Sequence, residues 1–267
     1  MQKGSLIGQG NTAEVFSWGE KEILKLFRKE FPKQGAEKEF LVSREVQEGG
    51  LSVPKVGELV EYEGRIGITY ERIYGESMLE RIFRKPWTIT KEAERLAELH
   101  YAIHKCTVKN ISSQKEALEW NIQKAELLSD EKEQKVSNIL KELPDGEVLC
   151  HGDFHPGNVL LTADRAVILD WMTATYGNPA ADVARTVLLL RDAALPPEIP
   201  WLIKLVFIFI RNRLCSAYLK KYLELSTIPI EEIRQWEVPV AAARLTEWIP
   251  KSEKEHLTKL VDSRLKS

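Results

Sequence analysis

A polar loop enclosed by short apolar runs, residues 151–158, constrains the fold of this chain more than any other segment. The apolar run 148–150 precedes the loop, and two more apolar runs follow it before Asp170. Short apolar runs bounded by turn-forming residues predict β-strands. We therefore expect strands on both sides of the loop, with a short hairpin at residues 158–170 and polar side chains held at the strand ends.

Three oxygen-bearing side chains follow one another in and after this loop, namely Asp153, Asn158 and Asp170. Phosphoryl transfer from ATP needs a group that orients the nucleophile and takes its proton, and it needs groups that hold charge-neutralising metal ions. Mg²⁺ prefers oxygen ligands. The order of the residues predicts that Asp153 accepts the proton of an acceptor hydroxyl and that Asn158 and Asp170 bind Mg²⁺.

Zinc is an alternative metal ion for the same loop, because His151, Asp153 and His155 are closely spaced. A structural zinc site needs four ligands in a tetrahedral arrangement, and no fourth ligand follows at a usual spacing. The sequence therefore favours a supporting role for the two histidines, through hydrogen bonds within the loop.

The pattern His-Gly-Asp-x-x-x-x-Asn at residues 151–158, followed by Ile-Leu-Asp-Trp at 168–171, resembles the aminoglycoside phosphotransferase and choline kinase superfamily. The members of this superfamily are small-molecule relatives of the protein kinases, whose loop usually carries His-Arg-Asp instead. The resemblance implies an α+β, protein-kinase-like fold of two lobes, with a small β-rich N-terminal lobe and a larger helical C-terminal lobe. It also implies ATP and Mg²⁺ as cofactors.

A second block at residues 177–182, Gly-Asn-Pro-Ala-Ala-Asp, is similar to the Gly-Asp-Pro-x-x-Asp block that follows the metal-binding Asp in this family. Asn178 departs from the family pattern, at a position that we interpret as structural. Asp182 matches it, and the resemblance implies that this side chain braces the loop at 151–158. The resemblance covers residues 4–191.

The N-terminal segment contains Gly8, Gly10 and Thr12 between alternating residues, and Lys25 lies within the strand-like stretch 22–27. Taken alone, the glycines indicate an ordinary hairpin turn, and Lys25 indicates a solvent-facing strand position. The kinase-like resemblance assigns the turn and Lys25 to the phosphates of ATP instead. A Walker motif is absent, and no helix follows the glycines as a Rossmann unit requires.

A buried Lys25 needs a carboxylate partner to stay charged. The predicted helix at residues 35–49 offers Glu37, Glu39 and Glu45. The family has a Glu in this helix, and Glu39 matches its spacing best, with Glu37 second. For Glu45 we favour a solvated helix face.

Two further strands are predicted at residues 56–62 and 65–71, joined by a turn at residues 63–64. The chain from Glu71 to Ile73 resembles the hinge between kinase lobes, where backbone groups meet adenine. We therefore expect Glu71 and Ile73 to contact the nucleotide through their backbone.

Helical patterns dominate after the hinge, which predicts an N-terminal nucleotide-binding lobe at residues 1–75 and a helical catalytic and acceptor-binding lobe at residues 76–267. The predicted helices span residues 88–107, 113–142 (two helices), 179–193, 198–225, 229–248 and 251–265, with prolines such as Pro196 and Pro197 at their boundaries. His100 and His104 lie one turn apart and could bind a metal, but packing beneath the loop is the favoured interpretation.

Composition excludes several classes. The 267 residues are 43% hydrophobic and 29% charged with a formal net charge of −2, which is typical of a soluble globular protein and argues against a nucleic-acid partner. Residues 1–15 lack a signal-peptide pattern, and the longest apolar run, 201–210, is too short to span a bilayer and predicts a buried helix. Three cysteines favour a reduced, cytoplasmic setting over a disulfide framework.

The acceptor is expected to be a small molecule with a hydroxyl group, such as an aminoglycoside-like antibiotic or an amino-alcohol or sugar metabolite. A polycationic acceptor would need several carboxylates, and a quaternary ammonium group would need an aromatic wall. The candidates are Glu119, Glu224, Glu231, Glu232, Glu237 and Glu247 for the first, and Trp120, Trp236 and Trp248 for the second. Residue by residue, solvated helix faces are the favoured interpretation of the glutamates, and core packing is that of the tryptophans. Arg211 and Arg213 could instead meet an anionic acceptor.

Taken together, the sequence predicts an ATP- and Mg²⁺-dependent kinase of small molecules. Two alternatives are a catalytically weak nucleotide-binding regulator and a protein kinase. Intact residues at 25, 153, 158 and 170 argue against the first, and the short stretch 170–182 leaves little room for the activation segment of the second. The sequence predicts neither an oligomeric state nor a preference between ATP and GTP.

Overall fold

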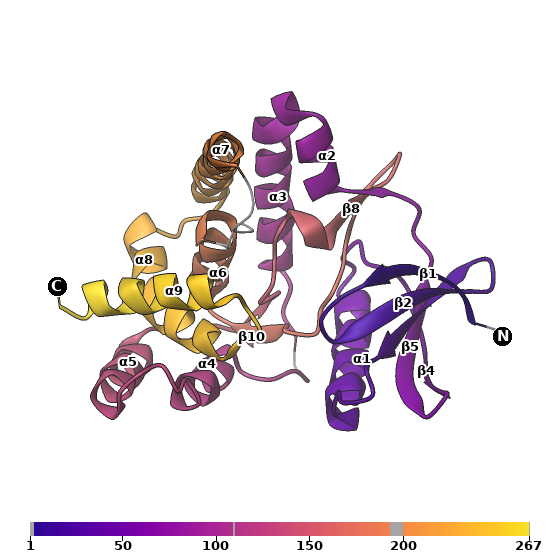
Figure 1. The fold of residues 1–267 in the computed structure, drawn as a ribbon, viewed down its shortest axis with the longest axis horizontal. Helices are drawn as coiled ribbons and strands as arrows, with labels where there is room; N and C mark the ends of the chain where they lie inside the picture. The colour runs from indigo at the N-terminus through magenta and orange to yellow at the C-terminus, as the bar shows by residue number, and fades with distance from the viewer. Residues whose placement is uncertain (1–2, 109, 193–199, 267) are drawn as a thin grey trace. The chain divides into compact units, whose positions relative to one another are not determined.

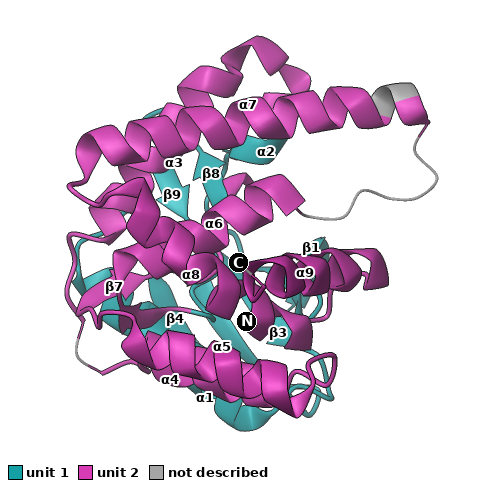
Figure 2. Ribbon diagram, turned by 90° about the vertical axis from the view of Figure 1, so that its left-hand side faces the viewer, with its two compact units in different colours: residues 1–80, 157–173 teal, residues 81–156, 174–267 magenta. Residues whose placement is uncertain are grey.

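The computed structural model describes residues 3–108, 110–192 and 200–266, which form two compact units (Figures 1 and 2). The first unit comprises residues 1–80 and 157–173, and the second comprises residues 81–156 and 174–267. The hairpin at 157–173 therefore folds with the N-terminal strands, although it lies within the helical half of the sequence. The lobe boundary at residue 75 stays a prediction.

The first unit is built on a five-stranded antiparallel sheet with the strand order β1-β2-β3-β5-β4. The strands are β1 (Lys3–Gln9), β2 (Ala13–Trp18), β3 (Glu22–Phe27), β4 (Val56–Tyr62) and β5 (Arg65–Glu71). The turn between β4 and β5 has positive φ at both Glu63 and Gly64. Such a two-residue turn matches the twist of antiparallel strands, which explains why the hairpin was readable from the sequence.

Helix α1 (Lys33–Glu48) packs against β4 and β5. The core beneath it contains Ala13, Phe27, Ala36 and Ile68, and partly buried aromatic residues such as Phe31 enlarge it. Burial of these apolar side chains supplies the main driving force for folding this unit and fixes the position of α1 on the sheet.

A three-stranded sheet, of order β6-β8-β9, completes the first unit. Its strands are β6 (Glu76–Ser77), β8 (Val159–Leu161) and β9 (Ala166–Ile168), and Val159 pairs with Ile168. Beyond this pair, the Leu169 N–H donates to the Asn158 carbonyl oxygen at 2.9 Å. The pairing brings the start of β8 and the end of β9 to one end of the hairpin.

The second unit is mostly helical around a two-stranded antiparallel sheet of β7 (Val148–Cys150) and β10 (Thr175–Gly177). Its helices are α3 (Ile89–Ile103), α4 (Gln114–Gln123), α5 (Asp130–Glu142), α6 (Pro179–Asp192), α7 (Trp201–Leu225), α8 (Ile230–Ala243) and α9 (Lys251–Arg264), and α2 (Met78–Arg84) begins in the first unit. Helix α3 packs against α7, and α8 packs against α4, α5, α6 and α9. The α+β class predicted from the sequence is confirmed.

The prediction of a buried helix at residues 201–210 is wrong in one respect. These residues begin α7, but Trp201, Leu205, Val206, Ile208 and Phe209 are exposed, because α3 and α6 cover only one side of the helix. No helix among the described residues is long and apolar enough to cross a membrane. Residues 193 and 198–199 of the predicted helices, and the boundary at Pro196 and Pro197, lie outside the described residues.

Candidate active site

Lys25 lies at the centre of a charged cluster in the first unit. Its Nζ is 2.7 Å from Glu39 Oε1 and 3.1 Å from Asp170 Oδ1. The register of β3 places Lys25 between Val15 of β2 and Ile68 of β5, and its side chain reaches Glu39 of α1. Of the two favoured carboxylates, Glu39 makes the contact, whereas the exposed Glu37 approaches Lys33 on its own helix instead.

Burial and charge oppose each other in this cluster. Burial alone would lower the pKa of Lys25, but Asp170 and Glu39 raise it, so that the ammonium group stays charged. Burial also raises the pKa of Glu39, against the lowering effect of Lys25. Tyr70 donates a hydrogen bond to Glu39 Oε1 at 3.2 Å, whereas Glu39 Oε2 is buried with no partner among the described residues. The charges of Glu39 and Asp170 therefore both act on the Lys25 ammonium group.

The two residues predicted to bind a metal ion lie at the same end of the β8–β9 hairpin. Asn158 precedes β8, Asp170 follows β9 by two residues, and the backbone bond between Leu169 and Asn158 joins them. Asp170 adopts a φ of 60°, an uncommon conformation for a residue with a side chain, and its side chain is 43% exposed. The Asp170 carboxylate therefore touches Lys25 yet remains open to an ion from solvent.

The glycine-containing turn joins β1 and β2. The Gly10 N–H donates to the Ala13 carbonyl oxygen at 2.8 Å, and Arg28 donates to the carbonyl oxygens of Gly10 and Asn11. The Arg28 N–H also bonds to the Thr12 carbonyl oxygen at 2.8 Å. Gly8 pairs with Val15 across the two strands. The turn is thus an ordinary hairpin tied to β3 by Arg28, and phosphate binding by Gly8, Gly10 and Thr12 stays a prediction.

The predicted hinge continues the hydrogen bonding of the five-stranded sheet. The Glu71 N–H donates to the Lys55 carbonyl oxygen and the Arg72 N–H to the Lys21 carbonyl oxygen, each at 2.8 Å. The Lys55 N–H bonds to the Glu71 side chain. These contacts fix the backbone at Glu71 and Arg72. Adenine recognition by Glu71 and Ile73 stays a prediction.

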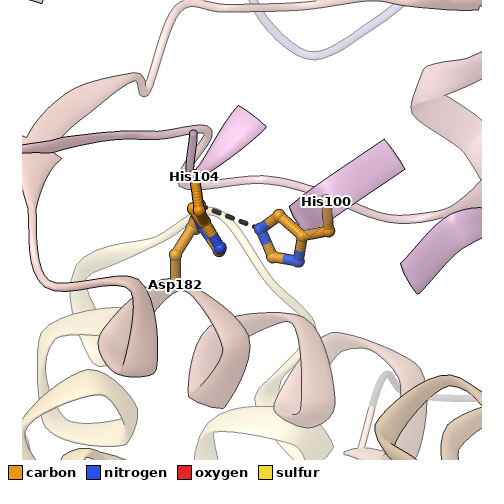
Figure 3. A group of neighbouring side chains, drawn as sticks. All are labelled: His100, His104 and Asp182. Atoms are coloured by element: carbon orange, nitrogen blue, oxygen red, sulfur yellow. Dashed lines mark hydrogen bonds and ion pairs between the residues drawn. The ribbon is translucent and has the colours of Figure 1, made fainter. Parts of the chain in front are cut away.

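In the second unit, Asp182 organises the loop that carries Asp153. Its carboxylate accepts hydrogen bonds from the backbone N–H groups of His151 at 2.6 Å and Gly152 at 2.9 Å. Asp182 is fully buried, so four donors around one carboxylate replace its hydration, the other two being imidazoles of α3 (Figure 3). These contacts hold the pKa of Asp182 well below its usual value although burial raises it.

The two imidazoles belong to His100 and His104. The Nε2 atom of each lies 3.0–3.2 Å from Asp182 Oδ2, and the Nδ1 atom of each lies 2.6 Å from a tyrosine hydroxyl, that of Tyr218 or Tyr222. Burial, followed by the neighbouring His104, lowers the pKa of His100 to about 4, so that His100 is neutral near pH 7. The ligand atoms of His100, His104 and Asp182 converge to within 4.8 Å, but hydrogen bonds account for every nitrogen, which favours the packing interpretation.

Helix α6 supports the same loop from two further positions. The Arg185 Nε atom donates to the Gly152 carbonyl oxygen, and the Thr186 hydroxyl donates to the Phe154 carbonyl oxygen at 3.0 Å. Residues 182, 185 and 186 lie on one face of the helix, because they are spaced by three and four positions. Sequence reasoning missed Arg185 and Thr186, although their spacing from Asp182 was the signal that could have found them.

Asp153 lies close to positive charge. Its carboxylate is 3.9 Å from Arg185 and 3.7 Å from His155, and its N–H bonds to His151 Nδ1. Burial would raise the pKa of Asp153, but the hydrogen bond from His155 and the charge of Arg185 outweigh it and lower that pKa. Asp153 is therefore a carboxylate near pH 7, as a proton acceptor must be. Its role as the base stays a prediction.

Asn178 caps helix α6, which agrees with the structural role expected for it. Its Oδ1 accepts a hydrogen bond from the Ala180 N–H at 2.8 Å, and its own N–H donates to Gln114 Oε1 at 2.9 Å. An Asn side chain performs this capping as well as an Asp does. The departure from the family pattern therefore leaves the start of α6, and hence Asp182, in place.

The aromatic candidates for an acceptor pocket do not form a cage. Trp236 is fully buried, whereas Trp120 and Trp248 are exposed. Because a cage needs several rings that face one open space, the buried Trp236 cannot contribute; it packs in the core, which is the commoner fate of a tryptophan. Helix α8 buries this side instead against the neighbouring helices of the second unit.

Comparisons with known proteins agree with the fold. A family model described as the phosphotransferase enzyme family matches residues 3–203. The solved structure of aminoglycoside phosphotransferase APH(4)-Ia has a TM-score of 0.65 and 15% identity, with 97% of this chain and 90% of that chain covered. Amicoumacin kinase hAmiN has a TM-score of 0.63 and 15% identity, with 97% and 86% covered. A choline/ethanolamine kinase family protein from Mesorhizobium loti has a TM-score of 0.59 and 17% identity, with 97% and 84% covered.

The fold is therefore that of the kinase-like small-molecule phosphotransferases, which confirms the predicted fold class. The chain belongs to the phosphotransferase enzyme family. The predicted enzyme class, a small-molecule kinase, agrees with this membership. A comparison with curated proteins found no match.

Proposed function

We propose that this enzyme transfers the γ-phosphoryl group of ATP, with Mg²⁺, to a hydroxyl group of a small molecule. The observation that carries the proposal is the position of Lys25 between Glu39 and Asp170. A buried ammonium group with one fixed carboxylate and one solvent-accessible carboxylate suits the binding of phosphates beside a metal ion. A purely structural ion pair would need only one carboxylate.

Asp153 takes the proton of the acceptor hydroxyl in this proposal. Its ionised state near pH 7 and the braces on its backbone support this role. The acceptor oxygen forms a bond to the γ-phosphorus while the bond to the ADP oxygen breaks, and the hydroxyl proton goes to Asp153. Positioning supplies much of the rate, because the loop holds Asp153 before the acceptor arrives.

Asn158 and Asp170 would hold Mg²⁺. Both offer oxygen atoms at one end of the same hairpin, and the exposed Asp170 carboxylate provides the charge that a hard cation requires. When bound, Mg²⁺ neutralises charge on the phosphates. The open Asp170 supports this assignment, because Lys25 contacts its Oδ1 atom while the carboxylate remains accessible to solvent.

The nucleotide-binding part is assigned to residues 1–75, with Gly8, Gly10 and Thr12 near the phosphates. Glu71 and Ile73 meet adenine through their backbone. Structural neighbours support nucleotide binding, since one contains AMP-PNP with Ca²⁺ and another contains ATP with streptomycin. The remainder of the chain, residues 76–267, would carry catalysis and acceptor binding. Three free cysteines suit a reducing compartment such as the cytoplasm.

The test measures acceptor-dependent release of ADP from Mg²⁺-ATP, over aminoglycosides, choline, ethanolamine, amino acids with hydroxyl groups and sugars. We expect release with at least one acceptor, and loss of release in Asp153→Asn by about 10²–10⁴-fold in kcat, the usual contribution of a general base. Nucleotide binding, measured by calorimetry, should persist in this variant. Normal turnover by Asp153→Asn would reject the role of Asp153.

Chelation of divalent metal provides the second arm of the test. We expect transfer to stop when EDTA is added and to resume with excess Mg²⁺. Asp170→Asn and Asn158→Ala should raise the Mg²⁺ concentration that gives half-maximal rate. Transfer that continues in EDTA would reject the metal role of both residues, and a failure of the wild-type enzyme to bind ATP would reject the whole proposal.

A further inference from the structure

Arg185 of α6 lies between two carboxylates of the second unit, at unequal distances. Its Nη1 atom is 2.6 Å from Glu247 Oε1, the length of a short, charge-assisted hydrogen bond. Its Nη2 atom is 3.9 Å from Asp153 Oδ1, which is beyond hydrogen-bond distance. The Nε atom of the same guanidinium donates to the Gly152 carbonyl oxygen, next to Asp153 in the chain. Arg185 therefore supports the backbone of the Asp153 loop while its charge is paired with Glu247.

Glu247 is itself held in place by the segment before it. The 3₁₀ helix Arg244–Thr246 ends at Glu247, whose N–H donates to the Arg244 carbonyl oxygen at 3.1 Å. The Arg244 side chain is fully buried, and its Nε atom is 3.2 Å from Glu247 Oε2. The Nη2 atom of Arg244 lies 2.7 Å from Glu253 Oε1. Because Arg244 holds one oxygen of Glu247, the other oxygen meets Arg185 at a defined position.

Several ionisable groups surround the Asp153 carboxylate within the second unit. His155 Nε2 is 3.7 Å from that carboxylate, His151 Nδ1 accepts a hydrogen bond from the Asp153 N–H, and Arg185 approaches from α6. Asp182 of the same helix adds a negative charge near Arg185. Burial raises the pKa of Asp153, whereas the hydrogen bond from His155 and the charge of Arg185 lower it. A direct bond from Arg185 would lower this pKa further, because an opposite charge in contact favours the ionised carboxylate.

The distance between Arg185 and Asp153 matters for a group that must accept a proton. A general base becomes less effective as its pKa falls further below the operating pH. An arginine in direct contact with a carboxylate lowers the pKa of that carboxylate and occupies an oxygen that a hydroxyl group would otherwise approach. At 3.9 Å, Arg185 bonds to the loop backbone without forming such a contact.

We propose that Glu247 is a positioning residue, which holds the Arg185 guanidinium away from Asp153 and so preserves Asp153 as a proton acceptor. The proposal rests on the proposed kinase function, because it concerns the base of the same transfer. Glu247 acts through Arg185 and touches no reacting atom. When Glu247 loses its charge, Arg185 turns to Asp153, the other carboxylate near its guanidinium, and forms a direct ion pair with it.

The first experiment measures kcat and KM of Glu247→Gln, with the best acceptor found in the ADP-release test. The substitution keeps the shape of the side chain and removes its charge. We expect kcat to fall by about tenfold, because a base whose pKa drops by one unit binds a proton tenfold more weakly. KM for the acceptor should stay within about twofold of wild type, since binding of the acceptor is not altered.

The matched control for this experiment is Asp192→Asn. Asp192 is an almost fully buried carboxylate at the end of the same helix as Arg185, and it is paired with Arg191. The control should leave kcat unchanged. A rise in KM of Glu247→Gln with an unchanged kcat would overturn the proposal, because it would place Glu247 in contact with the acceptor.

A double variant separates positioning from a structural role. Arg185→Gln retains a donor for the Gly152 carbonyl oxygen and removes the guanidinium. In this background Glu247→Gln should cause no further loss of kcat, since the group that it would release is absent. A structural role of Glu247 through Arg244 would act in both backgrounds. Equal losses of kcat in the two backgrounds would therefore overturn the proposal.

A chemical measurement makes the test independent of turnover and of the folding of Arg185→Gln. A water-soluble carbodiimide activates the protonated form of a carboxyl group, which an added amine then converts to an amide. Sparse modification of Asp153 is followed by mass spectrometry of its peptide. Near pH 5, Glu247→Gln should modify Asp153 at about a tenth of the wild-type rate, because the direct ion pair lowers the pKa by about one unit. Asp192→Asn should match wild type, and an unchanged rate in Glu247→Gln would overturn the proposal.

The two proposals fail in different ways. Loss of nucleotide binding by the wild-type enzyme would overturn the kinase function, whereas the carbodiimide rates would still decide whether Glu247 holds Arg185 away from Asp153. An unchanged kcat in Glu247→Gln, in an enzyme whose turnover is lost in Asp153→Asn, would overturn the positioning role alone and leave the kinase function intact.

Discussion

The Lys25 cluster of the first unit and the Asp153 loop of the second are held in place by different kinds of contact. Lys25, Glu39 and Asp170 come from β3, from α1 and from the end of the β8–β9 hairpin, and they meet through their charges. The Asp153 loop is held through its backbone, by side chains of α6 that bond to the N–H and carbonyl groups of residues 151–154.

This difference indicates which substitutions should change function and which should change stability. Lys25 and Asp170 meet at the solvent-open side of their cluster, so that this contact can be changed while the sheet and its apolar core remain intact. Buried side chains that satisfy backbone groups cannot be removed without leaving several polar groups unpaired. We therefore expect substitutions in the Lys25 cluster to alter nucleotide binding first, and substitutions beneath the Asp153 loop to alter folding first.

The largest expected effect is that of Asp182→Ala, because it removes one buried carboxylate from four donors. The loss of free energy of unfolding should be about 3–5 kcal/mol, as for other buried charged groups that lose their partner. Urea unfolding of Asp182→Ala and of wild type measures it. Asp182→Asn keeps the shape and part of the accepting capacity, so it should lose less.

A loss of under about 1 kcal/mol in Asp182→Ala would contradict this view of the loop. It would mean that water replaces the carboxylate, and that the loop depends on α6 less than the contacts indicate. The comparison between the two units would then lose its basis.

The next prediction uses pH to test the hydrogen bonds between Asp182 and the two histidines. The pKa of His100 is lowered from 6.5 to about 4 in the folded protein, so between these values the unfolded chain binds more protons than the native one. Stability therefore falls as the pH falls through this window, by about 2 kcal/mol between pH 7 and pH 5 for this group. Urea unfolding at both pH values, in wild type and in His100→Gln, measures the contribution of His100 as the difference between the two slopes.

A wild type and a His100→Gln variant with equal pH dependence would show that His100 does not titrate in this window. The charged Lys25 cluster provides the contrast, since the pKa of Lys25 is raised and its contribution is complete at both pH values. Acidification from pH 7 to pH 5 should thus weaken the second unit selectively.

The sequence predicted most of the fold because its signals were local. The β4–β5 hairpin has alternating side chains in its strands and a turn at Glu63 and Gly64, where φ is positive. The alternation and the glycine of the turn are both visible in a short stretch of sequence. The loop at 151–158 was readable for the same reason. The ends of the helices shifted by a few residues, as for 88–107 against Ile89–Ile103, because capping depends on local backbone geometry.

The parts that the sequence did not predict depend on contacts between distant segments. The spacing of Arg185 from Asp182 places it on the helix face toward the loop, but nothing near it in the sequence shows that its side chain also reaches Glu247, 62 positions away. The exposure of Phe209 on α7 depends on how few helices lie beside it, which a run of apolar residues does not encode. Glu39 was preferred over Glu37 by resemblance, and the structure supplies the contact that distinguishes them.

In the first unit, Lys25→Met should weaken nucleotide binding. The substitution removes the ammonium group and keeps the length and apolar character of the side chain. We expect the dissociation constant for ATP, measured by calorimetry, to rise about tenfold or more, the value of one hydrogen bond to a charged group. The free energy of unfolding should fall by no more than about 3 kcal/mol at pH 7, because a buried Glu39 without its partner can take up a proton, at a cost set by the difference between the pH and its pKa in the unfolded chain.

Lys25→Arg is the matched control for that prediction, because it keeps the charge but changes its geometry. It should retain more ATP binding than Lys25→Met. If Lys25→Met bound ATP as tightly as wild type, Lys25 would be a structural ion pair, and the contrast between the two units would disappear.

The smallest expected effect is that of Tyr70→Phe, which removes one donor from the Lys25 cluster. The Tyr70 hydroxyl bonds to Glu39 Oε1 and lies 3.2 Å from Ser43 Oγ, and its ring packs against the core of the first unit. The loss in free energy of unfolding should be about 1 kcal/mol, as for one neutral hydrogen bond, because the ring remains and Lys25 still holds Glu39. ATP affinity should change by less than about threefold, because the Tyr70 hydroxyl bonds to Glu39 and not to the nucleotide.

Thr186→Val, which removes one donor from the Asp153 loop, is the comparison in the second unit. If Tyr70→Phe weakened ATP binding as much as Lys25→Met, the orientation of Glu39 rather than the charge of Lys25 would govern the cluster.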